Sequence, residues 1–341
     1  MSDNPKTMKA WVYTSAAGGV EKNLKLVSDA SAPFPEALPK DVVLVKVHSS
    51  SLNPVDYKLP ELGLLSRLIV CTPASPGLDF AGVVAAVGSA VTGYSAGDKV
   101  FGRIEPNKYG TLGEYVPAKA EGIALVPEGV SLEDASTIGT AGLTAFQCIV
   151  PNVKAGDKVF INGGSGGTGS FGIQFAKAVG CHVTTSCSAK NEELVRKLGA
   201  DEVIDYTKEN VSEALKAKGQ VFKLAVDNIG STPADLYKAA DHYLLPEGKF
   251  MQVTVEMSLG GVANVTSRQL RPSFLGGGKR KLEFYITKNS HKDLEQIAKW
   301  FEEGKVKAVI DEVFQHEDAP KAFEKLKTGR VKGKVVIRGS A

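Results

Sequence analysis

The sequence is short of cysteine, of long apolar runs and of net charge, and each shortage argues against a class of protein. Its four cysteines, Cys71, Cys148, Cys181 and Cys187, form no Cys-x-x-Cys pair, so we expect buried thiols and neither a disulfide framework nor a thiolate zinc site. No run of about twenty apolar residues occurs, so no transmembrane helix is expected. The net charge of +3 at pH 7 argues against a dedicated nucleic-acid-binding protein, and we expect no nucleic-acid partner.

The chain is long enough for two domains. Its 341 residues are 43% hydrophobic, which allows a large buried core. The first residues, MSDNPKTMKAWVY, contain neither the apolar stretch of a signal peptide nor the arginines of a transit peptide. We therefore expect a cytoplasmic protein.

A glycine-rich stretch follows the short apolar run 158–162, which has the pattern of a strand. Gly164, Gly166 and Gly169 stand at the spacing GxGxxG, and apolar residues at helical intervals continue to Val179. Glycines at such a turn let a pyrophosphate approach the backbone at a helix N-terminus. The loop could also be only a turn, but further strand and helix alternations follow, so we interpret it as a dinucleotide site. Its predicted contact residues are Gly164, Ser165, Gly166, Gly167, Thr168 and Gly169.

The end of the next strand indicates which dinucleotide binds. An acidic residue is expected there when the ribose 2′-hydroxyl is free. The sequence instead has Ser186, Ser188 and Lys190, whose hydroxyls and ammonium suit a 2′-phosphate. Ser188 could simply cap the following helix, with Lys190 in solvent. We favour NADPH over NADH as the cofactor.

Two different patterns divide the chain. Up to about residue 125, short strands separated by turns predict a partly closed β-barrel. From about Pro127, strands alternate with helices, which predicts a Rossmann fold, a doubly wound parallel sheet of six strands. The expected fold class is therefore α/β. The expected domains are residues 1–127 with 288–341, and residues 128–287.

The segment 254–281 has no clear period, and loops of this length are usually functional or mobile. Its basic residues are Arg268, Arg271, Lys279, Arg280 and Lys281. They could meet anionic lipid, so peripheral membrane contact through residues 268–281 is an alternative to a solvated loop. The tail after this segment, with strands at 306–314 and 334–338, is not another strand–helix repeat and is expected to return to the N-terminal barrel.

Short motifs that are typical of one protein family occur along nearly the whole chain. They are SLNPVDYK (51–58), PGLDFAGVVAAVG (76–88), GDKVFG (97–102), GTLGEYV (110–116), TAGLTAFQ (140–147), GGSGGTGSFGIQFAK (163–177), LVRKLGADEVIDY (194–206) and GKVVI (333–337). Together they resemble the zinc-free quinone oxidoreductase group of the medium-chain dehydrogenase/reductase superfamily. SAKN (188–191) and EGKVKAVID (303–311) are most similar to the plant and fungal branch that includes chloroplast-envelope quinone oxidoreductase homologues. The resemblance implies a GroES-like barrel for substrate and catalysis and a Rossmann domain for NADP.

The resemblance also implies where a metal would be held. The alcohol dehydrogenase branch has a Cys ligand at or near the position of Asn53, and a His-Glu pair where this chain has Leu78-Asp79. Zinc needs three converging protein ligands, which these residues cannot supply, so we expect no metal. Without a Lewis acid, reducing a quinone or the C=C bond of an α,β-unsaturated carbonyl compound is easier than oxidising an alcohol.

The predicted catalytic residues are Tyr57 and Lys58. The phenol could hydrogen-bond the substrate oxygen or relay a proton, and the ammonium could stabilise negative charge; the alternatives are a packed aromatic and a surface lysine. In similar enzymes the NPxD segment lies beside the nicotinamide, so the resemblance implies that Asn53 and Asp56 orient the cofactor.

Further cofactor contacts are implied by resemblance or by the carboxyl edge of the sheet. Thr144 resembles a nicotinamide contact, although a helix threonine can also bond to its own turn. Tyr206 resembles a residue that lies against the 2′-phosphate or adenine. The remaining predicted contacts are Asp227, Asn228, Gln252, Val253 and Lys334.

Two other functions remain open at this stage. One is a trans-acting enoyl reductase of a polyketide pathway, and the other is a peripheral membrane or trafficking protein that retains the fold with little catalysis. If the chain is a quinone or enone reductase, its expected partner is a small-molecule quinone or enone substrate. By resemblance, the edge strand 282–286 pairs across a two-fold axis, which predicts a homodimer.

Overall fold

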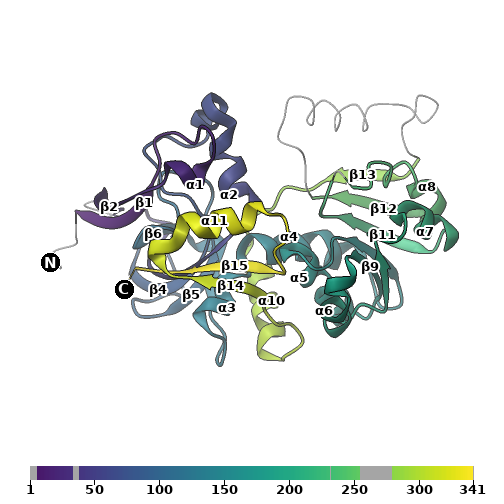
Figure 1. Cartoon of the computed structure of the whole chain (residues 1–341). Coiled ribbons are helices and arrows are strands. Elements are labelled where there is room, and N and C mark those ends of the chain that lie inside the picture. The colour runs from purple at the N-terminus through teal and green to yellow at the C-terminus, as the bar shows by residue number, and fades with distance from the viewer. Residues whose placement is uncertain (1–5, 34–37, 231, 254–278, 341) are drawn as a thin grey trace. The chain divides into compact units, whose positions relative to one another are not determined.

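The structure is a computed structural model that describes residues 6–33, 38–230, 232–253 and 279–340. The chain forms two compact units, shown in Figure 1: unit 1 comprises residues 1–143 and 289–341, and unit 2 comprises residues 144–288. The first boundary falls inside helix α4 (Gly139–Ile149). Helix α3 (Leu132–Ser136), which sequence reasoning assigned to the second domain, lies in unit 1.

Unit 1 is built on a seven-stranded sheet with the order β14-β15-β3-β4-β5-β7, in which β6 also pairs with β3. The strands are β3 (Val42–Leu52), β4 (Asp79–Val87), β5 (Lys99–Arg103), β6 (Tyr115–Lys119), β7 (Ile123–Leu125), β14 (Ile310–Phe314) and β15 (Lys334–Arg338). Strand β3 is shared: its first half pairs with β6, its last residues pair with β15, and β4 runs along most of it. Register shifts in the β3–β4 pair bend the sheet on itself, which gives the expected partly closed barrel.

A hairpin and several short helices complete unit 1. The hairpin is β1 (Thr7–Val12) with β2 (Lys25–Ser31). The helices are α1 (Val20–Asn23), α2 (Pro54–Lys58), η1 (Pro60–Leu68), η2 (Ala120–Gly122), α3, α10 (His291–Glu302), η6 (His316–Asp318) and α11 (Ala319–Lys327). One core fills the barrel with valines of β3 and Phe80. A second core lies between α11 and the hairpin and contains Trp11 and Phe323.

The C-terminal tail returns to the barrel, as expected. Strand β15 pairs antiparallel with β3 and parallel with β14. Helix α11 packs on β15, and the yellow helix and strand lie side by side in Figure 1. The tail therefore contributes strand residues to the same sheet that carries the NPxD segment at the end of β3.

Unit 2 contains the predicted six-stranded parallel sheet, with the order β10-β9-β8-β11-β12-β13. Its strands are β8 (Lys158–Asn162), β9 (His182–Cys187), β10 (Glu202–Asp205), β11 (Phe222–Asp227), β12 (Leu244–Gln252) and β13 (Lys281–Phe284). The helices and turns between them are η3 (Val150–Asn152), α5 (Gly167–Val179), η4 (Ala189–Asn191), α6 (Glu192–Lys197), α7 (Val211–Ala217) and α8 (Ala240–Tyr243). The order reverses beside β8, so the carboxyl end of β8 lies at the switch point where ligands bind in such sheets.

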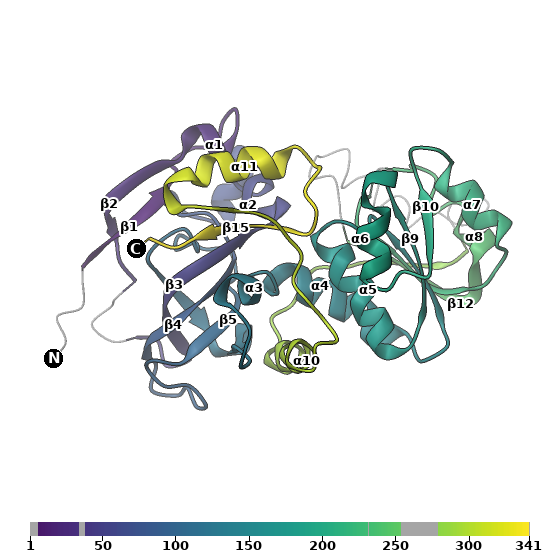
Figure 2. The same ribbon diagram turned by 60° about the horizontal axis from the view of Figure 1, so that its bottom comes forward.

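Successive side chains along each strand point to opposite faces of this sheet, and each face has its own hydrophobic core. Ile161 and Ile173 belong to the core beneath α5 and α6. Phe160 and Tyr243 belong to the core beneath α7 and α8. Figure 2 shows α5 and α6 on one side of the strands and α7 and α8 on the other. This two-sided burial explains the short apolar runs at the centre of the sheet, residues 159–161 of β8 and 224–226 of β11.

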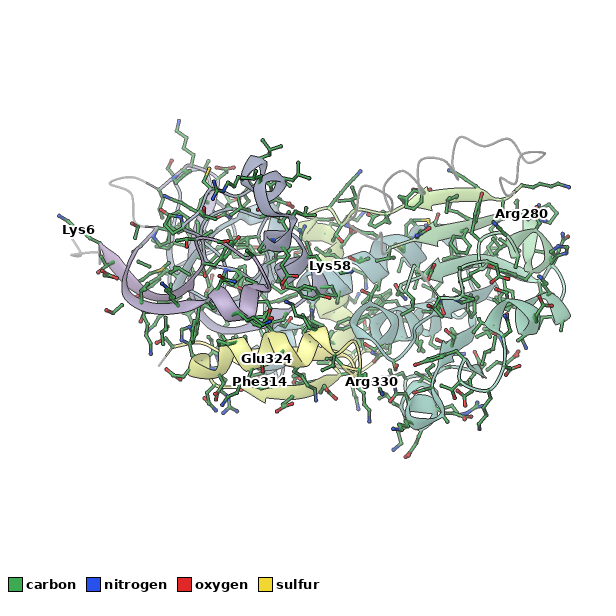
Figure 3. All side chains as sticks on the ribbon, turned by 45° about the horizontal axis from the view of Figure 1, so that its top comes forward. Lys6, Lys58, Arg280, Phe314, Glu324 and Arg330 are labelled. Carbon is green, nitrogen blue, oxygen red and sulfur yellow. The ribbon has the colours of Figure 1, made fainter. Side chains whose placement is uncertain are left out.

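Three expectations concern features outside these sheets. Cys148, Cys181 and Cys187 are buried as expected, but Cys71 is exposed, because the η1 segment leaves its end in solvent. Within the described residues, no helix is both long enough and apolar enough to cross a membrane. Most of the basic segment 268–281 lies outside the described residues. Of its described members, Arg280 (Figure 3) directs its guanidinium to the carbonyl oxygens of Leu244 and Asp241.

Candidate active site

The glycine loop of unit 2 joins β8 to the thirteen-residue helix α5. Gly163 turns the chain with a φ of 78°, and Gly166 is the N-cap residue of α5. No side chain caps this helix N-terminus. The first-turn N–H groups of α5 therefore have no intrahelical acceptor and form a positively polarised helix end at the carboxyl edge of the sheet.

The three glycines of the GxGxxG spacing are needed for different reasons. A Cβ on Gly164 would meet Thr185 and lie 3.0 Å from Cδ1 of Ile173, and a Cβ on Gly169 would meet the backbone of Gly163 and Gly164. These two glycines allow the turn and the helix to pack. A Cβ on Gly166 would meet only the carbonyl oxygen of Gly163, at 3.7 Å, and its backbone is in the extended region that any residue adopts. Nothing in the described part of the chain requires glycine at 166, which leaves the space above the loop for a ligand.

A buried amide that sequence reasoning did not select, Asn162, organises the loop. Its Oδ1 accepts a 2.5 Å hydrogen bond from Ser186 Oγ, and its Nδ2 donates to Asp227 Oδ1 at 2.8 Å and to Thr232 O at 3.0 Å. Asn228 Nδ2 donates to the carbonyl oxygen of Asn162 at 3.0 Å. The predicted contacts Ser186, Asp227 and Asn228 are thus brought together with Asn162 at the ends of β8, β9 and β11. Ser186 also accepts from Gly163 N, so its hydroxyl is used in shaping the loop.

The segment after β9 is fastened to the glycine loop. Asn191 Nδ2 donates to Ser165 Oγ at 3.0 Å, so η4 and the loop are held together. Lys190 is exposed, Ser188 is half-exposed and precedes η4 without a capping hydrogen bond, and Tyr206 is 55% exposed after β10. The nearby Asp205 carboxylate accepts from Thr207 within its own turn and pairs with Lys208.

The other predicted contacts in unit 2 lie at several points along the chain. Thr144 on α4 shares a hydrogen bond with Thr287. Gln252 is buried at the end of β12, and Val253 donates its N–H to Asp227 O at 3.0 Å. The loop residues Gly167 and Thr168 form the first turn of α5.

In unit 1, four buried polar side chains from distant parts of the chain form one network. Asn53, Asp56, Asp79 and Lys334 are 5%, 3%, 0% and 3% exposed. Asn53 Nδ2 donates to Asp79 Oδ2 at 2.8 Å, and Lys334 Nζ donates to Asn53 Oδ1 at 2.5 Å and lies 3.5 Å from Asp79 Oδ2. Thr140 donates to Asp79 Oδ1 from its N at 2.8 Å and from its Oγ1 at 2.6 Å. The network joins the ends of β3 and α2 to β4, α4 and β15.

Lys334 carries the positive charge of this network. Its Nζ also donates to Leu52 O at 2.9 Å, so all three ammonium hydrogens have an acceptor. Burial lowers the pKa of Lys334, and the carboxylates of Asp79 and Asp56 oppose that shift. The ammonium of Lys334, a predicted cofactor contact, therefore donates its hydrogen bonds to groups of unit 1.

Asp56 is the titratable group of the network. Its Oδ2 accepts the N–H of Asn53 at 2.6 Å, which closes the capping box of α2. Burial, followed by the charge of Asp79, raises the pKa of Asp56 to about 7, against the hydrogen bond from Asn53 and the charge of Lys334. Near neutral pH this carboxyl group exchanges between acid and carboxylate.

The two predicted catalytic residues lie on α2 but outside this network. Tyr57 is half-buried in the core beneath α11, with Lys327 Nζ 5.2 Å from the centre of its ring. Burial and the charge of Glu61 raise the pKa of Tyr57, so its phenol is neutral at pH 7. Lys58, labelled in Figure 3, is half-exposed.

The residues at the zinc position of the alcohol dehydrogenase branch do not suit a metal ion. Asn53 offers an amide, Leu78 offers no ligand atom, and the Asp79 carboxylate is occupied by Asn53 and Thr140. The Lys334 ammonium stands beside both and would repel a cation. Among the described residues, no group of three His, Cys, Asp or Glu side chains could hold a metal ion.

Comparison with known proteins agrees with this geometry. Residues 39–128 match the family described as alcohol dehydrogenase GroES-like domain, and residues 198–337 match the family described as zinc-binding dehydrogenase. Trans-enoyl reductase pgmF of Aspergillus terreus is 47% identical over an alignment that covers 98% of this chain and 97% of pgmF. The chloroplastic NADPH-dependent alkenal/one oxidoreductase of Arabidopsis thaliana is 35% identical, covering 98% of this chain and 80% of the relative. The solved quinone oxidoreductase from Coxiella burnetii is 32% identical with a TM-score of 0.82, covering 98% and 99% of the two chains.

The chain belongs to the medium-chain dehydrogenase/reductase superfamily, with quinone and enone oxidoreductases among its relatives. It is an oxidoreductase that uses a nicotinamide cofactor. The resemblance identified from the sequence motifs is confirmed, as are the GroES-like and Rossmann folds.

Proposed function

We propose that the chain is an NADPH-dependent, metal-free reductase that transfers a hydride to quinones or to the C=C bond of α,β-unsaturated carbonyl compounds. The observation that carries the proposal is the uncapped N-terminus of α5 beneath Gly166, a glycine with no steric reason to be one. The oxygens of a pyrophosphate over this loop would accept hydrogen bonds from the N–H groups of the first turn of α5. The names of the Arabidopsis alkenal/one oxidoreductase and the Coxiella quinone oxidoreductase support this class of acceptor.

The choice of NADPH rests on the rim beside the glycine loop. Ser188, Lys190 and Tyr206 present two hydroxyls, an ammonium and an aromatic ring to solvent next to a segment fastened to Ser165. No carboxylate ends β9, and the carboxylate of Asp205 is engaged in its own turn. A 2′-phosphate would find an ammonium partner there and little repulsion.

The chain's residues divide the work between the two units in this proposal. When bound, a reduced nicotinamide supplies a hydride to the electron-poor carbon of the acceptor. The loop of unit 2 binds the phosphates, with Thr144, Asp227, Asn228, Gln252 and Val253 as further cofactor contacts. Unit 1, comprising the barrel and the C-terminal return, carries the predicted catalytic residues Tyr57 and Lys58, with Asn53 as a predicted cofactor contact. Negative charge develops on the acceptor's carbonyl oxygen, so a hydrogen-bond donor is required at that oxygen.

A pair of glycine variants tests the cofactor site. Gly166→Ala should leave the folded structure and its unfolding transition intact, because its Cβ has room. Because that Cβ would occupy the space proposed for pyrophosphate, NADPH affinity should fall by at least tenfold, measured by quenching of protein fluorescence. Gly129 in an exposed turn is the control: its φ of 77° makes alanine costly to stability there, but its Cβ would meet no other atom, so Gly129→Ala should bind NADPH normally once folded. Unchanged affinity in Gly166→Ala would remove the central observation.

Turnover measurements test the reaction class. NADPH and NADH oxidation are compared against benzoquinones, short enals and cyclic enones. The proposal expects NADPH to be preferred and at least one of these acceptors to be reduced. Preference for NADH would show that Ser188, Lys190 and Tyr206 do not select a 2′-phosphate, and no turnover with any acceptor would reject the reaction class.

A second candidate function, a trans-acting enoyl reductase, is favoured by the 47% identity to pgmF across nearly the full length of both chains. Such an enzyme would reduce an enoyl group held as a thioester. Free enones and an enoyl thioester on a pantetheine carrier distinguish the two candidates. A kcat/KM at least a hundredfold higher for the carrier thioester would favour this second function.

We also propose a homodimer formed through β13. This strand ends the sheet of unit 2, so one of its edges has no strand partner among the described residues. Ile286, just beyond it, is 82% exposed. An apolar sheet edge of this kind is covered in many proteins by a second copy of the chain.

A further inference from the structure

A pocket in unit 1 contains two buried polar atoms without a hydrogen-bond partner. The pocket is a hollow open to solvent, with about 300 Å³ of space when the adjoining solvent is included, and its wall is mostly apolar, with Val55, Leu59 and Leu78 among the lining residues. Asp56 and Ser75 also line it, and they are 3% and 5% exposed. Neither Asp56 Oδ1 nor Ser75 Oγ has a partner among the described residues.

A buried polar atom without a hydrogen-bond partner destabilises a folded protein, so a chain that retains two of them in one pocket points to a role for them. Elsewhere in the same wall, Asn107 is fully used: its Nδ2 donates to Glu105 O at 2.8 Å and its Oδ1 accepts from Tyr109 N at 2.7 Å. Among the fully buried side-chain oxygen and nitrogen atoms of the described lining residues, Asp56 Oδ1 and Ser75 Oγ are the two without a partner. An apolar pocket with a small number of unpaired polar groups is the usual form of a site for a small organic ligand.

The bonding of Asp56 determines which of its oxygens carries a proton. Oδ2 accepts the N–H of Asn53 at 2.6 Å, so the acid form places its hydrogen on Oδ1. Ser75 also has a hydroxyl hydrogen to donate. Two donors without acceptors in one apolar pocket suit an oxygen with two lone pairs, which is the carbonyl oxygen of an enone, an enoyl thioester or a quinone.

We propose that Asp56, in its carboxylic-acid form, and Ser75 donate hydrogen bonds to the carbonyl oxygen of the acceptor bound in this pocket. The inference rests on the proposed function and names the donors that the proposed reaction requires. It assigns Asp56 to the substrate, whereas the sequence motif implied a cofactor contact. As negative charge develops on the oxygen, both hydrogen bonds strengthen, which lowers the barrier to reduction.

The surroundings of Asp56 keep the acid form available at neutral pH. Burial and the charge of Asp79 on β4 raise its pKa to about 7, and Lys334 on β15 lowers it. Tyr13, which follows β1 and lines the same pocket, has its own pKa raised to about 12 by burial and by Asp56, so it stays neutral. Above pH 7 the donor becomes a carboxylate, which repels the carbonyl oxygen.

The test measures binding of 2-cyclohexen-1-one to the full chain with saturating NADP⁺, which cannot deliver a hydride. Titrations followed by ligand-observed NMR run from pH 6 to pH 9. For the unchanged protein, Kd should rise about tenfold per pH unit above the pKa of the donor. Asp56→Asn keeps the acceptor for Asn53 N and a neutral donor, so its Kd should be flat with pH and lower than that of the unchanged protein at pH 9. Ser75→Ala should bind roughly three- to tenfold more weakly at every pH.

Asp98→Asn is the matched control, because Asp98 Oδ2 accepts Ser95 N at 2.7 Å in the same three-residue arrangement, away from the pocket. This variant should keep the pH dependence of the unchanged protein. If Asp56→Asn keeps that dependence too, or if Ser75→Ala binds normally, the inference is wrong even when enones are reduced. If the unchanged protein neither binds nor reduces any acceptor, the proposed function itself fails, so the two failures are distinguishable.

Discussion

Replacing Lys334 by methionine tests whether the buried ammonium holds unit 1 together. Methionine retains most of the side-chain volume, so the change removes charge without opening a large cavity. The carbonyl oxygen of Leu52 and the Oδ1 of Asn53 lose their donor, and the carboxylate of Asp79 loses its nearby cation. Asp79 keeps its donors from Asn53 and Thr140, and this limits the loss.

The expected cost is about 3–5 kcal/mol in the free energy of unfolding, as for a buried ion pair that loses one partner. The 3.5 Å separation of Lys334 Nζ and Asp79 Oδ2 argues for the lower part of that range. The second change Asp79→Asn should recover part of it, because the uncompensated negative charge is then removed. Without the lysine, Asn53 can turn its amide to accept from the new asparagine. We expect a coupling energy of about 2 kcal/mol in the double-mutant cycle.

Urea unfolding at pH 7, followed by tryptophan fluorescence, measures the free energy of unfolding of unit 1, because both tryptophans, Trp11 and Trp300, belong to that unit. Lys325→Met is the control: Lys325 pairs with Asp311 at 3.0 Å near the surface of α11, and its loss should cost under about 1 kcal/mol. A Lys334→Met protein as stable as this control would refute the reasoning, as would a double variant no more stable than the single one.

Four further outcomes are expected. Gly169→Ala should destabilise unit 2 by about 1–3 kcal/mol, because its Cβ would meet backbone atoms of Gly163 and Gly164; an unchanged calorimetric transition would contradict this. The stabilising effect of protonated Asp56 is complete below about pH 4 and is lost as the pH rises through about 7, so unfolding free energy relative to Asp56→Asn should fall by about 4 kcal/mol from pH 4 to pH 8. A flat difference in urea titrations would show that the raised pKa is wrong. A chelator should leave NADPH oxidation unchanged, and loss of activity restored by zinc would reject the metal-free mechanism. Ile286→Glu, just beyond β13, should convert a dimer to a monomer by light scattering, whereas a dimer that persists must use another surface.

Much of the fold could be predicted because its signals are local. The apolar run of β8, the glycines after it and the helical period of α5 are contiguous, so each is visible in a short window. The return of β15 to the barrel was expected because the tail breaks the strand–helix repeat. The sequence does not indicate strand β2, whose seven residues are all exposed or half-exposed, or the three-residue strand β7, because neither has a regular apolar period.

The site was only partly predictable, since its polar networks are not local. Asn162 was read as the last residue of a strand, and nothing in the sequence indicates that it bonds Ser186 and Asp227. Asp79 had one usable signal, an acidic residue inside an apolar strand, which is rarely tolerated without a partner. The partner, Lys334, is separated from Asp79 by most of the chain, so the sequence does not identify it.

The sequence by itself determined the two folds and the position of the nucleotide loop, because periodicity and glycine spacing act over a few residues of neighbouring chain. Only the tertiary structure decided the protonation chemistry. The ends of β3, β4 and β15 bring Asn53, Asp56, Asp79 and Lys334 into one buried space, and burial there moves the pKa of Asp56 toward neutrality. Desolvation and charge proximity depend on distances in space, which residue order alone does not specify.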